Sequence, residues 1–195
     1  MDGVHDMTQA GVEPGSEFVY RFVVPDPGTY WFHPHMGLEL DRGLYAALIV
    51  DNPSEPLDYD VEFAVVLDDW LDGFGTTPEA VLRGLQSEGG HSAHDMGSMD
   101  MGQMGAMTGL NGDVSYPLHL INGRAPSERS QFDATPGQRV RLRIINAASD
   151  TAYRFAVGGH ELTVTHTDGF SVEPVTVDHI VLGMGERYDV ILTAG

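Results

Sequence analysis

The stretch Pro136-Gly137-Gln138-Arg139-Val140-Arg141-Leu142-Arg143-Ile144-Ile145-Asn146 decides the fold class, because turn residues lead directly into a run typical of a β-strand, which we predict at residues 139–146. Further strands, with turn residues between them, are predicted at residues 61–67, 118–121, 152–157, 161–167, 175–182 and 188–192. One short helix is predicted at residues 77–85, with Thr77 as its cap and Pro78 at the first helical position. This part of the chain is therefore predicted to be an all-β sandwich.

A second, smaller group of strands precedes this unit. The alternation at residues 18–22 predicts a strand, and Gly28-Thr29-Tyr30-Trp31-Phe32 and residues 44–50 predict two more. These strands are too few to close a sandwich. We expect an incomplete domain at 1–53, a linker at 54–60 and a near-complete domain at 61–195. An open sheet edge would leave residues 1–53 poorly stable or associated with a partner chain.

Composition excludes several classes of function. Among 195 residues there are 29 acidic and 10 basic side chains, for a net charge of −19, and every basic residue is Arg. Such a charge argues against nucleic acid or an anionic membrane as a partner. The absence of Cys excludes disulfides, thiolate metal sites and a blue-copper centre within these residues. No apolar run reaches the length of about 18 residues that spans a bilayer, and no signal segment follows Met1.

The strand at residues 28–32 runs into His33-Pro34-His35. Residues two apart on a strand face the same side, and a rise of about 3.3 Å per residue separates their attachment points by roughly 6.6 Å. That spacing suits two imidazoles that bind two neighbouring metal ions. Pro34 donates no backbone hydrogen bond and so belongs at a strand end, where both rings can face an open site. The alternative is a partly exposed histidine pair that binds no metal.

Residues 86–109 form a Gly, Ser, Met and His tract with no strand or helix period. Its candidate ligands for Cu(I) are Met96, Met99, Met101, Met104, Met107, His91 and His94. Thioethers are soft ligands that prefer Cu(I), and a flexible tract allows three of them to converge. The alternative is an insertion whose composition has drifted without function.

Two parts of the chain resemble the multicopper oxidases. Their second copper-binding signature is similar to Pro27-Gly28-Thr29-Tyr30-Trp31-Phe32-His33-Pro34-His35 followed by Gly43-Leu44-Tyr45-Ala46-Ala47-Leu48-Ile49-Val50. Their middle domain is similar to the stretch from Asn122-Gly123 through residues 136–146 to Gly183-Met184-Gly185-Glu186-Arg187-Tyr188-Asp189-Val190. The resemblance covers nearly the entire chain, and laccase-like bacterial metallo-oxidases of actinobacterial type with a Met-rich insertion are the most similar members.

The resemblance implies a fold and a ligand set. It implies cupredoxin-like Greek-key β-sandwiches, with the end of the first domain and the middle domain present here. In that family a type 1 copper and a trinuclear cluster are bound, the cluster by four His-X-His pairs. By resemblance, His33 and His35 each bind a different copper of the type 3 pair. The first His-X-His pair is expected upstream of Met1, and the third and fourth pairs with the type 1 ligands beyond Gly195.

The implied cofactor is copper and the implied reaction is one-electron oxidation of Cu(I) or phenolic substrates coupled to reduction of O2 to water. Since most of the ligands are expected outside these residues, we expect the isolated chain to be inactive and to need flanking domains or an associating chain. The resemblance also implies a location that is extracellular or in the periplasm or cell envelope. The alternatives are a copper-buffering protein that uses the Met/His tract and a truncated product with no independent function.

The other histidines and the paired carboxylates are expected to have structural roles. His119, His160, His166 and His179 fall in or beside predicted strands and are never two residues apart. Asp68 and Asp69 are adjacent on a predicted strand, so their side chains face opposite ways and cannot share a site. There is no Gly-X-Ser-X-Gly elbow and no Gly-rich phosphate loop, so hydrolase and nucleotide-binding functions have no support.

Overall fold

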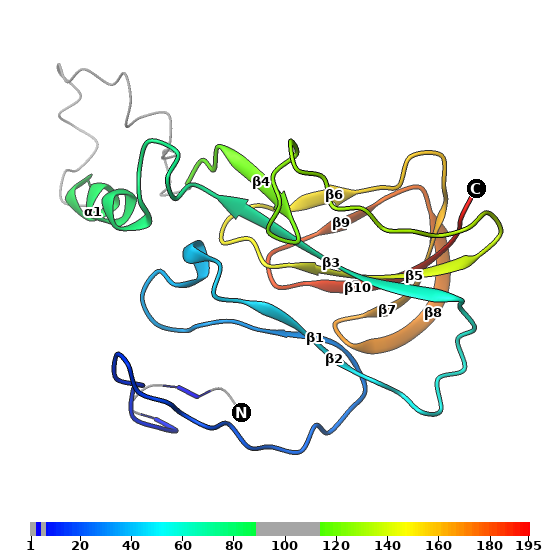
Figure 1. Ribbon diagram of the computed structural model, residues 1–195, viewed down its shortest axis with the longest axis horizontal. Coiled ribbons are helices and arrows are strands. Elements are labelled where there is room, and N and C mark those ends of the chain that lie inside the picture. Colours follow the sequence, from blue (N-terminus) through cyan, green and yellow to red (C-terminus); the bar gives the residue numbers. More distant parts are fainter. Residues whose placement is uncertain (1–2, 5–6, 89–113) are drawn as a thin grey trace.

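The computed structural model describes residues 3–4, 7–88 and 114–195, and most of the regular secondary structure in these ranges is β (Figure 1). A six-stranded sheet has the strand order β4-β3-β5-β10-β7-β8. Its strands are β3 (Val61–Trp70), β4 (Leu118–Ile121), β5 (Arg139–Asn146), β7 (Leu162–Thr167), β8 (Phe170–Val177) and β10 (Arg187–Thr193). Strands β3 and β5 are parallel, and the other neighbours in this sheet are antiparallel.

Two smaller sheets cover the two faces of the large one. One consists of β6 (Tyr153–Phe155) and β9 (Ile180–Leu182), and the other of β1 (Gly28–Phe32) and β2 (Ala46–Val50). Residues of β6 and β9 pack into the main core beside Leu142 and Val190. Because neighbouring strand residues point to opposite faces, Arg143 and Asp189 lie on the other side, where they contact Thr29 of β1. The all-β sandwich predicted from the sequence is confirmed.

Strand β5 is buried along almost its whole length because both of its faces are covered. Val140, Leu142 and Ile144 belong to the apolar core. Arg141 and Arg143 face β1 and are 1% and 3% exposed. The alternation of apolar and Arg residues in β5 thus matches two different environments, an apolar core on one side and a charged contact with β1 on the other.

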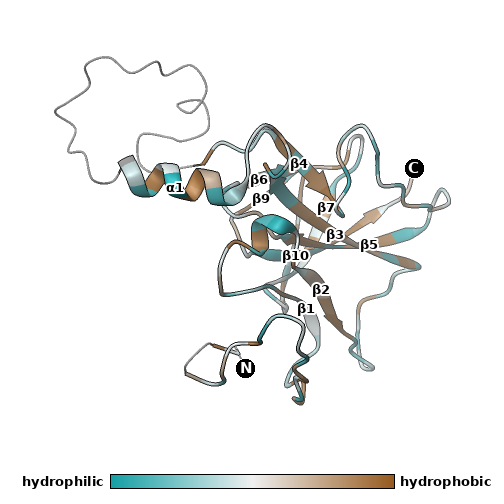
Figure 2. Cartoon of the chain, turned by 60° about the vertical axis from the view of Figure 1, so that its left-hand side comes forward, coloured by the Kyte–Doolittle hydropathy of each residue, from teal (hydrophilic) through white to brown (hydrophobic). Residues whose placement is uncertain are grey.

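Two short helical elements lie outside the sheets: a 3₁₀ turn, η1 (Leu40–Arg42), and the helix α1 (Pro78–Glu88). Figure 2 shows α1 at the edge of the molecule with both polar and apolar residues. Thr77 caps it as predicted, since its Oγ1 accepts a hydrogen bond from the backbone N–H of Ala80 at 3.3 Å. No helix in the described residues is long and apolar enough to cross a membrane.

Two sequence predictions of secondary structure are wrong. Residues 18–22 have no regular secondary structure, and Phe18, Tyr20 and Phe22 are about half exposed. Alternation produces a strand only where a neighbouring strand supplies hydrogen bonds, and in the described ranges no strand lies beside this segment. The strand predicted at residues 175–182 is two strands, because the chain bends at Asp178 and passes from β8 in the large sheet to β9 in the small one.

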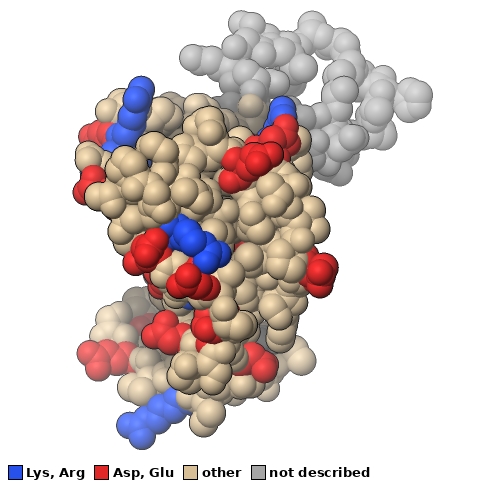
Figure 3. Space-filling view, turned by 90° about the vertical axis from the view of Figure 1, so that its right-hand side faces the viewer, with Lys and Arg blue, Asp and Glu red and all other residues tan. Residues whose placement is uncertain are grey.

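The surface carries the acidic excess that the composition predicts. In the face drawn in Figure 3, the few basic side chains stand among carboxylates, so no broad positive surface forms there. Several Arg side chains are also occupied by ion pairs, for example Arg42 with Asp72 and Glu79. This face is therefore unsuited to a polyanion and attracts cations.

Candidate metal centre

Strand β1 leads directly to the histidine pair. It pairs antiparallel with β2, from Gly28 opposite Val50 to Phe32 opposite Ala46. The strand ends at Phe32, and His33 is the next residue. Pro34 then prevents further pairing because it has no backbone N–H. The pair therefore stands at the end of a strand, as the sequence predicted.

The aromatic rings around the pair form a stack. The ring of Trp31 lies 4.2 Å from that of His33 with an interplanar angle of 18°. His33 lies in turn 4.6 Å from His35, centroid to centroid, with an angle of 26°. His33 is half-buried and His35 is exposed. Residues 31, 33 and 35 thus present their rings on one side of the chain, although the strand itself ends at Phe32.

The hydrogen bonding of His33 selects one ring nitrogen for metal binding. Its Nδ1 lies 3.1 Å from the carbonyl oxygen of Pro34. Because a carbonyl oxygen only accepts, Nδ1 carries the hydrogen and Nε2 keeps its lone pair. Neutral imidazole nitrogen is a good ligand for copper. The chemistry of the pair therefore fits copper, to which it could offer two imidazole nitrogens.

The pair is not a complete metal site within the described residues. No group of three or more His, Asp or Glu side chains in residues 3–4, 7–88 and 114–195 is placed to hold one metal ion. The candidate ligands His91, His94, Met96, Met99, Met101, Met104 and Met107 lie outside the described residues. Their role in Cu(I) binding stays a prediction, as does the division into domains at residues 53 and 61.

Contacts on both sides of the pair fix the segments that flank it. Before the pair, the Thr29 hydroxyl donates to Asp189 Oδ1 at 2.6 Å. After it, the Tyr116 hydroxyl donates to Asp41 Oδ1 of η1, also at 2.6 Å. Arg42 of the same turn pairs with Glu79 of α1 at 2.7 Å. The pair is thus held between two anchored segments, and both anchors come from parts of the chain distant in sequence.

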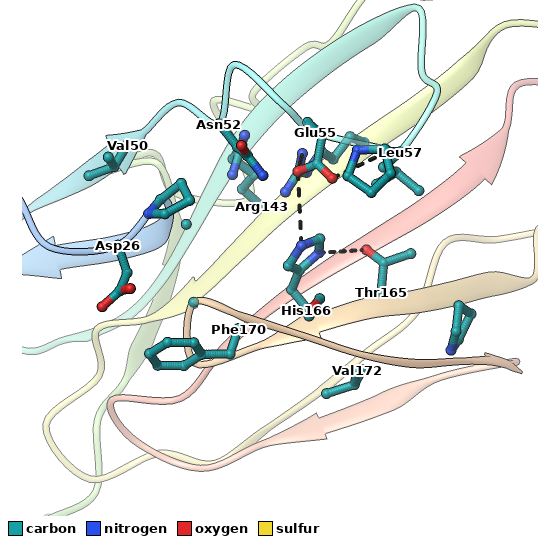
Figure 4. Close-up of a pocket in the computed structure, with 17 residues that line it drawn as sticks. Asp26, Val50, Asn52, Glu55, Leu57, Arg143, Thr165, His166, Phe170 and Val172 are labelled. Carbon is teal, nitrogen blue, oxygen red and sulfur yellow. Dashed lines mark hydrogen bonds and ion pairs between the residues drawn. The ribbon is translucent and has the colours of Figure 1, made fainter.

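A cavity of about 350 Å³ lies behind β1, between the segment that follows β2 and the β7–β8 hairpin (Figure 4). Its polar wall includes Glu55, Arg141 and His166. The His166 Nε2 is 3.9 Å from the Glu55 carboxylate, and its Nδ1 is 3.1 Å from Thr165 Oγ1. Burial is the main cause that lowers the pKa of His166 from its ordinary value, which favours the neutral ring. This histidine belongs to a buried polar cluster separate from the His33–His35 pair.

The remaining histidines of the second unit contact close neighbours. His119 Nδ1 lies 3.0 Å from the Tyr153 hydroxyl, and His160 Nδ1 lies 2.9 Å from the carbonyl oxygen of Gly158. His179 contacts Asp178 and Arg154. Each ring thus has a contact within the protein, as a structural role requires, and that role stays a prediction.

A buried acid–tyrosine network is present that the sequence did not reveal. The Tyr45 hydroxyl donates to Asp68 Oδ2 at 2.6 Å and thereby connects the start of β2 to β3. Burial raises the pKa of Asp68 to about 7, and the charge of Asp69 adds to this shift. Asp69 itself accepts from the Thr151 hydroxyl at 2.7 Å. The two carboxyl groups point to different partners, as their adjacent positions on a strand predicted.

Comparisons with known proteins identify the family. Residues 85–195 match the family described as multicopper oxidase, and residues 1–55 match a second family of the same description. The chain belongs to the multicopper oxidase family. Copper is the cofactor of that family, and the copper prediction is confirmed on this basis.

Individual relatives agree with this assignment. Multicopper oxidase MmcO of Mycobacterium tuberculosis is 49% identical over 100% of this chain and 39% of its own length. Copper resistance protein A of Escherichia coli is 35% identical over 98% of this chain and 35% of its own length. The chain therefore spans less than two fifths of the length of these two relatives.

Solved structures show the same fold. A multi-copper oxidase from Pseudomonas parafulva superposes with a TM-score of 0.74 at 32% identity, over 100% of this chain and 42% of that protein. A laccase from Botrytis aclada superposes with a TM-score of 0.72 at 27% identity, over 96% of this chain and 33% of that protein. The β-sandwich arrangement described above is thus shared with oxidases of this family.

Proposed function

We propose that the chain is the copper-binding portion of a multicopper oxidase in which His33 and His35 bind the two coppers of the type 3 pair. The observation that carries the proposal is the stacked pair at the end of β1, in which the Nδ1 of His33 contacts the carbonyl oxygen of Pro34 and so makes Nε2 the nitrogen available for metal. The remaining ligands come from flanking domains or from an associating chain. Membership of the family supports the cofactor, and the ring arrangement supports these two ligands.

The residues of the chain have definite parts in this chemistry. When bound, copper supplies one-electron transfer from a reductant such as Cu(I) or a phenol to O2, which is reduced to water. His33 and His35 hold metal through ring nitrogens, and Pro34 fixes the tautomer of His33 through its carbonyl oxygen. Trp31 packs on His33 and limits its rotation. The acidic surface raises the local concentration of Cu(I).

Several finer assignments accompany the proposal. The Met/His tract at residues 86–109 collects Cu(I) for the complete enzyme. Residues 1–53 belong to the end of a first cupredoxin domain and residues 61–195 to a middle domain, joined by residues 54–60. The protein acts outside the cytoplasm, in the periplasm or cell envelope or in the medium. Laccase-like oxidation of phenols and oxidation of Cu(I) are the two substrate classes.

Copper titration tests the proposal. The 195-residue chain is compared with a double variant, His33→Ala and His35→Ala, and both are titrated with Cu(II) while the electron paramagnetic resonance spectrum is recorded. We expect nitrogen hyperfine coupling from imidazole in the wild type and its loss in the double variant. Replacement of two histidines elsewhere, the exposed His119→Ala and the half-buried His179→Ala, is the control and should leave this signal unchanged. Equal signals from all three proteins would refute the assignment.

A second candidate function is copper buffering without catalysis. It is favoured by the composition of residues 86–109, where Met and His are concentrated. Deletion of residues 86–109 distinguishes the two functions when bound Cu(I) is measured by competition with a chromogenic chelator. Buffering predicts loss of most of the bound Cu(I), whereas the oxidase proposal predicts that Cu(II) binding at the pair survives the deletion. Neither function predicts turnover of a phenol by the isolated chain.

A further inference from the structure

Thr29 connects the strand of the histidine pair to the interior of the second unit. It lies four residues before His33 on β1 and is 1% exposed. Its hydroxyl donates to Asp189 Oδ1 at 2.6 Å and accepts from Arg143 Nη1 at 2.9 Å. The buried hydroxyl therefore donates one hydrogen bond and accepts another.

The groups that hold Thr29 are themselves fixed. Asp189 is 1% exposed and accepts from Arg141 Nη2 at 2.5 Å and from Arg143 Nη1 at 3.3 Å. The two guanidinium groups pair in addition with Glu55 and Glu62. Every buried polar atom of these side chains has a partner in the described structure. Such a satisfied network is rigid, because any displacement leaves a buried charge or donor unpaired.

Arg187 holds the backbone of the same strand. Its Nε donates to the carbonyl oxygen of Thr29 at 3.3 Å, and its guanidinium lies over the ring of Tyr30 at 5.8 Å from the centroid. The chain before Thr29 is also in close contact, because Gly28 packs directly on the backbone of Gly169. We call Thr29, Arg143, Arg187 and Asp189 the β1 clamp.

Within its own sheet β1 has a single partner. It pairs only with β2 in the described residues, and a two-stranded sheet is at best marginally stable alone. The direction in which β1 delivers His33 and His35 is therefore set by the contact with β5 and β10, to which the clamp belongs. A shift of Thr29 along this surface moves the histidines that follow it.

We propose that Thr29 is a positioning residue for the His33–His35 pair. It acts through the β1 clamp, so that strands β5 and β10 determine where the two histidines present their ring nitrogens. The predicted change in copper affinity rests on the proposed function. The predicted change in the stacking of the His33 ring does not, because it is measured without copper. It assigns a role in the metal site to Arg143, Arg187 and Asp189, none of which touches metal.

The variant Thr29→Val tests the proposal because it keeps the shape of the side chain and removes the hydroxyl. We expect Cu(II) affinity of the 195-residue chain to fall about tenfold, as is typical when a group that orients a ligand is lost. In the metal-free protein, the ring protons of His33 should lose the upfield shift that the stacked Trp31 ring causes in the NMR spectrum. Thr29→Ser, which retains the hydroxyl, should restore both properties.

Thr165→Val is the matched control. Thr165 is also buried, and its hydroxyl donates to the backbone oxygen of the same residue, Asp189, at 3.1 Å, but it belongs to β7. The variant loses a buried hydrogen bond of similar kind without a direct contact to β1. We expect wild-type ring shifts and wild-type Cu(II) affinity. If Thr29→Val does not fold, Arg187→Gln provides the second test, since Arg187 is only partly buried; a smaller loss in the same direction is expected.

The outcomes separate the two proposals. Wild-type ring shifts and affinity in Thr29→Val overturn the positioning role, and so does an equal loss of both in Thr165→Val. If the wild type binds no Cu(II) through His33 and His35, the proposed function fails. The ring shifts of the metal-free variants then still decide whether Thr29 orders the pair.

Discussion

Asp68 is a carboxyl group enclosed by protein and connected to a tyrosine. It is 2% exposed, and its pKa of about 7 lies well above its ordinary value of 3.8 because burial penalises the charged form. An acid whose pKa is raised on folding stabilises the protein at low pH. That contribution is lost as the pH rises from about 4 to about 7. Asp68 therefore makes the fold more stable at pH 5 than at pH 8.

Replacement of Asp68 by Asn measures this contribution. The amide oxygen of Asn can still accept from the Tyr45 hydroxyl, but it carries no charge at any pH. We expect the free energy of unfolding of Asp68→Asn, measured relative to wild type, to be higher at pH 8 than at pH 5 by about 2 kcal/mol, because only the wild type loses stability over this range. Urea unfolding at the two pH values gives the difference. The variant Glu128→Gln, at an exposed position, is the control. The prediction is contradicted if the free energy of unfolding relative to wild type is the same at pH 5 and pH 8 for Asp68→Asn as well as for the control.

At the scale of single residues, the sequence pointed to the histidine pair that we propose as metal ligands and could not predict what orients it. His33 and His35 are recognisable because their spacing and the proline between them carry the signal locally. Thr29 and Asp189 are 160 positions apart, and nothing in either neighbourhood indicates that they meet. The Asp68–Tyr45 contact likewise depends on how β2 lies on β3, which follows only from the folded chain.

At the scale of elements, prediction succeeded where turn residues and burial agreed. The predicted bounds of β4 and β5 agree with the structure, since turn residues precede each strand and apolar residues recur along it. The first half of β8 was missed because its side chains are exposed and include Pro174. The signal available was Asp168-Gly169, whose φ angles of 48° and 91° form the tight turn between β7 and β8.

The approach of β1 to this hairpin depends on Gly28. Its φ is 150°, and a Cβ atom there would overlap the backbone of Gly169. We expect Gly28→Ala to displace β1 and to lower the free energy of unfolding by about 2 kcal/mol or more. Gly158→Ala is the matched control, because a Cβ at that position meets no atom within 4 Å, and it should change stability by less than about 0.5 kcal/mol. Chemical denaturation of both variants makes the comparison, and equal stabilities would count against the close packing.

At the scale of the whole molecule, the apolar side chains differ from region to region in how far they are shielded from solvent. Apolar side chains of the segment before β1 are exposed, including Val19 at 68% and Val23 at 86%. Strand β5, in contrast, is covered on both faces. We expect thermolysin, which cuts before apolar residues, to cleave within residues 17–25 well before it cleaves within β5 or its neighbours β3 and β10. Mass spectrometry of the first products identifies the site. Equal protection of the two regions would argue that residues 1–53 are as stable as the rest.

The large sequence separation between Thr29 and Asp189 has a consequence for the order of folding. A contact between residues 160 positions apart closes almost the entire chain into one loop, and such closures are entropically unfavourable until local structure has formed. The groups that receive Thr29 lie on β5 and β10, which pair with each other in the sheet. We therefore expect β1 to dock late in folding, so that a newly made chain orders its His33–His35 pair only after its C-terminal strand has joined the sheet.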